Sequence, residues 1–212
     1  MPRISARIED YLTTIYRLEE ALGEAKTSDI SRELGVSNAT VSKIISRLES
    51  RGLVIREKYH RVTLTEKGRE IAREIIRRHR IAELFLAKIL GFNDRDAHYY
   101  AHYLEHLPSE IIERIYEYLG KPSTCPHGNP IVDHELNRGI TLNEAPDNKT
   151  CTVNRLLGEL KIVLEFASEN SIRVGSTIRI LGKDSDTIII ELNNREIRVP
   201  RRIARLIIVE CG

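Results

Sequence analysis

The pattern of apolar residues predicts helix, turn, helix and two strands in the first part of the chain. Apolar side chains recur at helical spacing over residues 4–22, and two shorter helices are expected over 27–34 and 37–51, separated by a Gly-Val-Ser turn. The β-branched run 53–64, interrupted by a charged turn, predicts two short strands. This order is typical of a winged helix-turn-helix, whose third helix enters the major groove of DNA.

The middle of the chain is expected to be helical and its last part rich in strands. Apolar spacing predicts a long helix over residues 65–90 and shorter ones over 94–107 and 109–119. Residues 120–148 contain several Pro, Gly and Asn and indicate a linker. β-branched runs within 171–199 predict a small barrel. The predicted fold class is α+β, with a winged helix-turn-helix, an all-helical domain and a small β-barrel over residues 1–72, 73–140 and 150–212.

Composition describes a globular protein without a membrane segment. The 212 residues are 41% hydrophobic and 30% charged, with a net charge of +2. No apolar run approaches the about 18 residues of a membrane span, and no signal-peptide core is present, so a cytoplasmic location is expected. The Cys residues number 3, without metal-knuckle spacing, which predicts no disulfide framework. The absence of Gln and Trp beside abundant Ile, Arg and Glu resembles the composition of a thermophile.

The expected recognition helix carries small polar side chains opposite its apolar face. Such groups can reach base edges, and basic residues further along the helix and on the wing can neutralise phosphates. The predicted DNA contacts are Thr27, Ser37, Asn38, Ala39, Thr40, Ser42, Lys43, Arg47, Lys58, His60 and Arg61. The alternative is a three-helix scaffold whose solvated basic face contacts only proteins. Because helix-turn-helix proteins normally bind as dimers, helices 73–90 and 109–119 are the candidates for a dimer interface.

Histidines are concentrated in two short segments of the chain. Four of the 7 His residues lie there, and each segment also holds a Glu at helical spacing. Imidazole nitrogens and carboxylate oxygens that converge from helices are common metal ligands. A solvated helix with His–Glu pairs is the alternative, but so many ligand types on one stripe favour a divalent metal. The candidate ligands are His79, Glu83, His98, His102, Glu105 and His106.

Several motifs together resemble the diphtheria toxin repressor family of metal-activated repressors, which includes iron-dependent and manganese transport regulators. The likeness covers nearly the whole chain, and the tail around Ile-Arg-Val-Gly at 172–175 resembles the family's SH3-like domain. The motifs are Glu-Asp-Tyr-Leu at 9–12, Val-Ser-x-Ala-Thr-Val-Ser at 36–42, Leu-Thr-Glu-Lys-Gly at 64–68, Arg-His-Arg-x-x-Glu at 78–83, the segment 98–106, and Cys-Pro-His-Gly-Asn-Pro at 125–130.

This resemblance implies two metal sites and a loop tether. The implied primary ligands are Asp10, His102, Glu105 and His106, and the implied ancillary ligands are His79, Glu83 and His98. Arg80 and Asn129 match positions where the family binds a small anion or tethers the connecting loop.

The chain also departs from the family pattern. Asp10 and His102 stand where iron-type members have a Met and a Cys, and Thr13 stands where manganese-type members have a second carboxylate on the first helix. The ligands of the family's SH3-like domain fall on Leu160 and Val163, which cannot bind a metal. Either of two nearby carboxylates, Glu159 or Glu165, is expected to substitute.

The resemblance implies a repressor that binds operator DNA as a homodimer when loaded with Mn(II) or Fe(II), and that controls genes of metal homeostasis. An all-nitrogen-and-oxygen primary site favours Mn(II) or Fe(II), with Zn(II) or Co(II) as substitutes. Asp10 lies in the DNA-binding module and the other primary ligands lie in the helical domain. Bound metal is therefore expected to fix the spacing of the two recognition helices.

Two other classes of function compete with this interpretation. A metalloenzyme could use the same ligands, but no HExxH motif is present and the winged helix would be unexplained. A metal-independent regulator could respond to a small molecule or to redox state, with Cys125 as its sensor. A structural role for Cys125 in its loop is the favoured interpretation.

Overall fold

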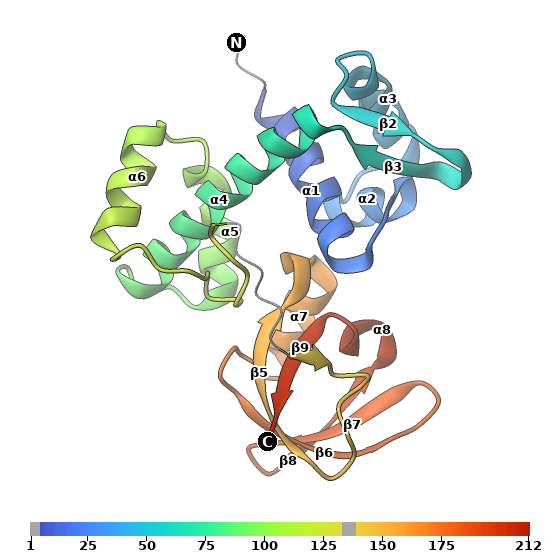
Figure 1. Ribbon diagram of the computed structural model, residues 1–212, viewed down its shortest axis with the longest axis vertical. Helices are drawn as coiled ribbons and strands as arrows, with labels where there is room; N and C mark the ends of the chain where they lie inside the picture. The colour runs from blue at the N-terminus through green and yellow to red at the C-terminus, as the bar shows by residue number, and fades with distance from the viewer. Residues whose placement is uncertain (1–4, 133–138) are drawn as a thin grey trace.

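The computed structural model describes residues 5–132 and 139–212, which form three parts along the chain (Figure 1). The predicted winged helix-turn-helix is present in the first part. Its elements are α1 (Ala6–Leu22), β1 (Ala25–Lys26), α2 (Thr27–Leu34), α3 (Asn38–Glu49), β2 (Val54–Arg56), the 3₁₀ turn η1 (Lys58–His60) and β3 (Arg61–Leu64).

Local signals explain the boundaries of these elements. Gly23 and Gly35 follow α1 and α2 with φ of 74° and 64°, the left-handed conformation that ends a helix. Ser37 caps α3, because its side chain accepts a hydrogen bond of 3.2 Å from the backbone N–H of Thr40. The strand β1 was not predicted, since its two residues carry no pattern, and it pairs with β3. The wing strands β2 and β3 thus belong to a three-stranded sheet in which β3 is the central strand.

The chain passes from the wing into the helical part at the start of α4, where two segments pack closely. The long helix α4 (Glu66–Lys88) begins beside the wing, where Thr65 caps it by accepting from the N–H of Gly68 at 3.1 Å. A Cβ atom at Gly68 would lie 2.0 Å from the carbonyl oxygen of Leu53, so only glycine fits there. The shorter helices α5 (Asp94–Leu104) and α6 (Ser109–Tyr118) pack against α4 (Figure 1).

The C-terminal part is built around a six-stranded antiparallel sheet in the order β4-β9-β5-β6-β7-β8. Strands β6 to β8 match the predicted β-branched runs. The strands β5 and β9 and the helix α7 were not predicted. In β5, polar residues interrupt the alternation of apolar and polar positions that marks a strand. The elements are β4 (Ile140–Thr141), β5 (Thr150–Leu156), the 3₁₀ turn η2 (Leu157–Glu159), α7 (Lys161–Glu169), β6 (Thr177–Lys183), β7 (Thr187–Leu192), β8 (Arg195–Pro200), α8 (Arg201–Ala204) and β9 (Ile207–Cys211).

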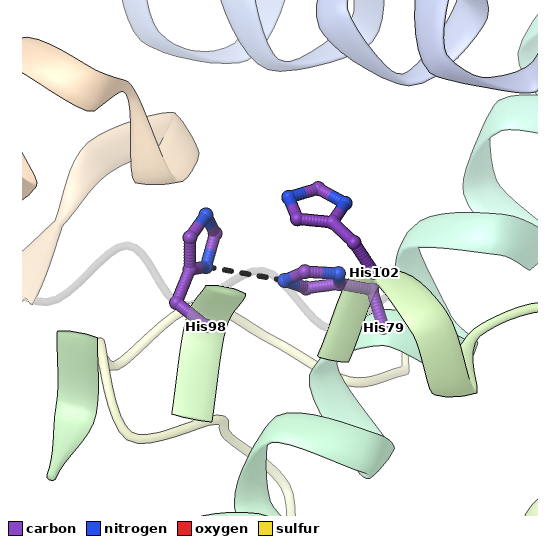
Figure 2. Close-up of side chains that lie close together, drawn as sticks. All are labelled: His79, His98 and His102. Atoms are coloured by element: carbon purple, nitrogen blue, oxygen red, sulfur yellow. Dashed lines mark hydrogen bonds between the residues drawn. The ribbon is translucent and has the colours of Figure 1, made fainter. Parts of the chain in front are cut away.

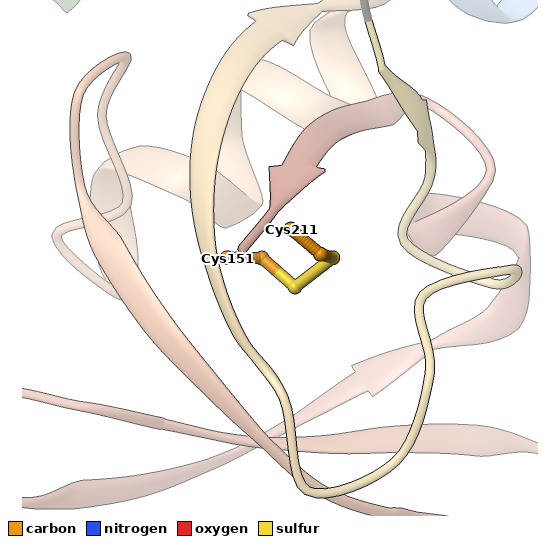
Figure 3. Close-up of a disulfide and its surroundings, with 2 residues drawn as sticks. All are labelled: Cys151 and Cys211. Atoms are coloured by element: carbon orange, nitrogen blue, oxygen red, sulfur yellow. A yellow bond between two sulfur atoms is a disulfide. The ribbon is translucent and has the colours of Figure 1, made fainter.

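Cys151 and Cys211 form a disulfide (Figure 3), so the expectation of no disulfide is wrong. The two residues are 60 positions apart in sequence, but β5 and β9 are antiparallel neighbours that place one opposite the other. The third cysteine, Cys125, is a buried free thiol. Sequence spacing alone could not reveal a pairing that the sheet register creates.

Buried apolar side chains of the winged helix and of the C-terminal sheet belong to one continuous cluster, whereas the helical part has two small clusters of its own. The C-terminal domain therefore packs on the winged helix as well as following the helical part in sequence. No helix among the described residues is long and apolar enough to cross a membrane.

Candidate metal centre

Three histidines from two neighbouring helices lie together between α4 and α5 (Figure 2). The ring nitrogens of His79, His98 and His102 lie within 4.8 Å of one another. His79 is fully buried, and the side chain of His102 is 43% exposed. The cluster therefore has one face in the protein interior and one that solvent reaches.

A second cluster joins the end of α5 to α1. Oxygen and nitrogen atoms of Asp10, Glu105 and His106 lie within 4.8 Å of one another. The helix α5 was predicted to reach residue 107, but it ends at Leu104. The turn that follows places Glu105 close to His102 of α5 and next to His106. His106 Nδ1 also lies 2.9 Å from Glu9 Oε2, so α1 contacts this turn through two consecutive carboxylates.

A third cluster contains two residues, Cys125 and His127, that were not among the predicted ligands. Ligand atoms of Glu83, Cys125, His127 and Glu159 lie within 4.8 Å of one another, and all four residues are buried. Cys125 and His127 lie on the loop after α6, and Glu159 lies in η2. The Cys-Pro-His spacing was the signal available in the sequence, since it puts a thiol and an imidazole two residues apart.

Hydrogen bonds connect these three clusters in series. His79 Nδ1 lies 2.6 Å from Glu105 Oε2, and His98 Nδ1 lies 2.9 Å from Glu83 Oε1 and 3.1 Å from His79 Nε2. A neutral imidazole that donates from Nδ1 to a carboxylate keeps a lone pair on Nε2. His98 therefore keeps a lone pair on Nε2 that is able to bind a metal, whereas the Nε2 lone pair of His79 faces Nδ1 of His98.

Burial and charge set the protonation states of these groups. Burial lowers the pKa of His79 and lowers that of His98 to about 3, so both imidazoles are neutral. Burial opposes ionisation of Glu105, but hydrogen bonds from His102 and His79 outweigh it and hold its pKa well below the usual value. Neutral imidazoles beside an ionised carboxylate are in the state that a metal requires.

Asp10 is the exception, because its surroundings disfavour its charge. Burial raises the pKa of Asp10, and the negative charge of Glu105 raises it further. Two carboxylates this close repel each other unless a cation lies beside both. The donor set of this cluster therefore fits a divalent cation.

Unpaired buried atoms support the same conclusion for the third cluster. Glu83 Oε2 and Glu159 Oε2 are buried and make no hydrogen bond within the described ranges 5–132 and 139–212, and the contact of buried His127 Nδ1 is with Glu83 Oε1 at 3.1 Å. Leaving such polar atoms without partners costs free energy. Nitrogen, oxygen and sulfur donors in one buried place fit a transition metal.

The structure distributes the predicted ligands differently from the two implied sites. His102 lies with His79 and His98, although its Nδ1 is also 3.5 Å from Glu105 Oε2. Glu83 lies with the loop residues as well as against His98.

The two alternative carboxylates of the C-terminal domain have different positions. Glu165 belongs to none of the clusters formed by described residues, because its side chain is 52% exposed on α7 and faces Lys161. Glu159 lies inside the third cluster, whereas a ligand role for Glu165 stays a prediction.

Arg80 and Asn129 both contact the C-terminal domain. Arg80 Nε donates to Glu159 Oε1 at 3.0 Å, and Asn129 Nδ2 donates to the carbonyl of Leu156 at 2.7 Å. A carboxylate of this chain thus occupies the place where a small anion was expected.

The predicted DNA contacts lie on one part of the surface. Ser37, Asn38, Ala39, Ser42, Lys43 and Arg47 are exposed on or just before α3, and Lys58, His60 and Arg61 are exposed on the wing. Thr27 and Thr40, at the beginnings of α2 and α3, are partly exposed.

The chain thus combines a winged helix, a fold typical of DNA-binding proteins, with adjoining clusters of potential metal ligands. Residues 3–62 match the N-terminal DNA binding domain of iron dependent repressors, residues 65–133 match their metal binding and dimerisation domain, and residues 140–211 match the FeoA domain.

Individual relatives agree with these matches. The iron-dependent repressor IdeR of Mycobacterium tuberculosis is 40% identical over 124 residues, which are 58% of this chain and 54% of that protein, so the chain spans about half its length. The diphtheria toxin repressor of Corynebacterium diphtheriae is 30% identical over 217 residues, 95% of this chain and 96% of that protein. The solved structure of the manganese regulator SloR superposes with a TM-score of 0.83 at 28% identity, covering 97% of this chain and 98% of that one.

The chain therefore belongs to the diphtheria toxin repressor family of iron- and manganese-dependent repressors, which are DNA-binding regulators and not enzymes. These matches confirm the predicted resemblance and the α+β fold, with a C-terminal FeoA domain of the SH3-like kind.

Proposed function

We propose that this chain is a metal-dependent repressor that binds operator DNA as a homodimer. The observation that carries the proposal is that Asp10 on α1 lies within 4.8 Å of Glu105 and His106. α1 belongs to the winged helix, whereas Glu105 and His106 end the helix α5 of the helical domain. Since such a regulator works where the DNA is, its proposed location is the cytoplasm.

The ligands are proposed to act by holding α1 against the end of α5. A divalent cation supplies, when bound, the positive charge that two neighbouring carboxylates lack. Asp10 then keeps α1 in one position, and the Glu9–His106 contact orients the His106 ring. The recognition helix α3 packs in the same domain as α1, so fixing α1 fixes the position of α3. In the metal-bound state, in which the ligands lie close together, the two recognition helices of the dimer have the spacing that fits both halves of an operator.

The proposed ligands fall into three groups along the hydrogen-bonded network. The groups are Asp10, Glu105 and His106 at α1; His79, His98 and His102 between α4 and α5; and Glu83, Cys125, His127 and Glu159 beside the C-terminal domain. His102 lies between the first two groups and can serve either.

Mn(II) or Fe(II) is proposed as the physiological metal. The group at α1 contains only nitrogen and oxygen donors, which suit these cations. The relatives support both choices, since one is an iron-dependent repressor and another a manganese regulator. Zn(II) and Co(II) are expected to substitute, because such ligands generally bind Zn(II) at least as tightly.

A groove lined with aromatic residues is the proposed dimer surface. Tyr103 and Tyr99 are 65% and 57% exposed, and both lie on the outer side of α5. The surface is exposed and apolar, as an interface between copies requires. By contrast, α6 buries Ile112 and Tyr116 inside the protomer. The groove residues are Phe85, Leu86, Leu90, Phe92, Tyr99, Tyr100, Tyr103 and Leu104.

A redox role for Cys125 has less support than a ligand role. Its thiol is 4% exposed, and burial followed by the charge of Glu159 raises its pKa well above the usual value. Reactive sensor thiols are accessible and have a lowered pKa. The surroundings of Cys125 therefore oppose oxidation unless a metal first removes its proton.

Metal removal tests the proposed function. A duplex can be selected from a random-sequence DNA pool by the Mn(II)-loaded chain and then used as the probe. Chelation is expected to lower affinity for this duplex about 100-fold at constant salt, and Mn(II) or Fe(II) should restore it. Titrations with Mn(II), Fe(II), Zn(II) and Co(II) at matched free concentrations would rank the metals. Equal affinity before and after chelation would contradict metal-dependent repression.

A further inference from the structure

The C-terminal domain touches the backbone of α1 at a place that only glycine permits. Gly158, in η2, has φ of +64°, and a Cβ atom there would lie 2.6 Å from the carbonyl oxygen of Arg17 and 2.8 Å from Cβ of Ala21. The next residue, Glu159, also has a positive φ of 50°, and its side chain is fully buried. This turn brings a carboxylate of the C-terminal domain beneath the winged helix.

Glu159 contacts the other two domains and the connecting loop. Its Oε1 accepts from Arg80 Nε at 3.0 Å, from Cys125 Sγ at 3.1 Å and from Asn129 Nδ2 at 3.2 Å. Its Oε2 lies 3.5 Å from a terminal nitrogen of Arg17. One carboxylate thus faces α1, α4 and the loop after α6.

The pair between Arg17 and Glu159 is not fully made in this arrangement. A tight hydrogen bond between charged groups is about 2.7–2.9 Å long, shorter than the 3.5 Å observed here. Arg17 Nε and Glu159 Oε2 are both buried, and neither has a hydrogen-bond partner in the part of the chain that the structure describes. A small movement of η2 or α1 would therefore close a buried ion pair.

A second contact between the same domains lies on α2. Glu33 Oε1 accepts from the backbone N–H of Lys161 at 2.7 Å, so a carboxylate of the winged helix caps the start of α7. A negative charge at a helix N-terminus is favourable, because the backbone N–H groups there lack partners. The C-terminal domain therefore contacts both helices that carry the recognition helix.

We propose that Arg17 and Glu159 form a second coupling route from the metal centre to the winged helix, separate from Asp10. Glu159 belongs to the cluster with Glu83, Cys125 and His127, whereas Arg17 carries a positive charge and cannot bind a metal itself. When a bound metal holds Glu159 in its cluster, the Glu159 carboxylate has a fixed position opposite Arg17. The ion pair between Arg17 and Glu159 then closes and restrains α1. Arg17 is thus a positioning residue, and the inference rests on the proposed metal-dependent function.

Hydrogen exchange in the full-length chain separates the two routes. Asp10→Asn removes the first route, and Mn(II) is still expected to slow amide exchange in α1 of this variant, about 10-fold. The double variant Asp10→Asn/Arg17→Met should lose that slowing while the cluster with Glu83, Cys125 and His127 still binds Mn(II). Slowing of the same size in both variants would overturn the proposal. The readout does not depend on DNA, so a failure of repression itself would be recognised separately in the chelation experiment.

Operator binding gives a second test with a matched control. Arg17→Met is expected to keep its Mn(II) affinity within about 3-fold and to bind the selected duplex about 10-fold more weakly than wild type. The control Arg69→Met removes another contact to α1, with Glu19 at 2.5 Å, that does not involve the C-terminal domain. It should change duplex affinity less than about 3-fold. Equal duplex affinity of Arg17→Met and wild type would contradict the second route.

A further variant covers the case in which Arg17→Met does not fold. Arg17→Lys keeps the positive charge but replaces the guanidinium that lies 3.5 Å from Glu159 Oε2. It should weaken Mn(II)-dependent duplex binding about 3-fold. A folded Arg17→Lys variant with wild-type duplex affinity would overturn the proposal.

Discussion

Glu105→Gln is expected to abolish metal-dependent operator binding while the protein stays folded. Glu105 belongs to the cluster with Asp10 and also accepts a hydrogen bond from buried His79, so it joins two of the ligand clusters. Glutamine keeps the size and one acceptor oxygen but removes the charge. We expect Mn(II) affinity to fall about 100-fold or more, because loss even of residues that only orient ligands typically costs 10–100-fold. Calorimetric Mn(II) titration measures this.

The matched control for that variant is Glu110→Gln on the neighbouring helix α6. The side chain of Glu110 is 78% exposed and pairs with Arg114 at 3.4 Å. This variant should bind Mn(II) as wild type does, because exposed ion pairs contribute little. Thermal unfolding without metal should be similar for both variants, whereas only Glu105→Gln should lose the rise in Tm caused by Mn(II). Wild-type Mn(II) affinity in Glu105→Gln would exclude Glu105 from the centre.

Tyr103→Glu is expected to convert the dimer to monomers and so remove operator binding. Tyr103 is the most exposed residue of the aromatic groove, and a carboxylate there would meet its own copy across an apolar contact. A monomer binds a single operator half-site, so it loses the gain in DNA affinity that comes from binding two half-sites at once. Affinity for the selected duplex should fall about 100-fold or more. Light scattering gives the mass in solution, and gel shifts give the affinity.

The control for the dimer surface is Tyr118→Glu. Tyr118 is 72% exposed at the end of α6, outside the groove. It should leave both mass and operator affinity near those of wild type. If Tyr103→Glu remains a dimer with wild-type affinity, the interface lies elsewhere on the protomer.

Periodicity and capping residues predicted the winged helix well, because its signals are local. The glycines after α1 and α2, the Ser37 cap and the apolar face of α3 each act within a few residues. The histidine stripe was predictable for the same reason, as its members share one helix and one turn. Local patterns therefore supplied both the fold of the first domain and most of the candidate ligands.

The grouping of the ligands could not be predicted, because it depends on contacts between distant segments. Glu83 and Glu159 are far apart in sequence, and the loop that carries Cys125 and His127 brings a thiol and an imidazole between them. The turn at Gly158, which buries Glu159, depends on packing against α1 rather than on any repeat. The disulfide depends similarly on the register of β5 against β9.

The most direct test of the central claim is the ratio of operator affinities with and without Mn(II) in Asp10→Asn. Asparagine keeps the shape of the side chain but takes away the charge that α1 contributes to the centre. Wild type should show a ratio of about 100, and Asp10→Asn a ratio below about 10, because only the weaker route through the C-terminal domain remains. An unchanged ratio in Asp10→Asn would contradict the account, since the metal would then act on DNA binding without α1.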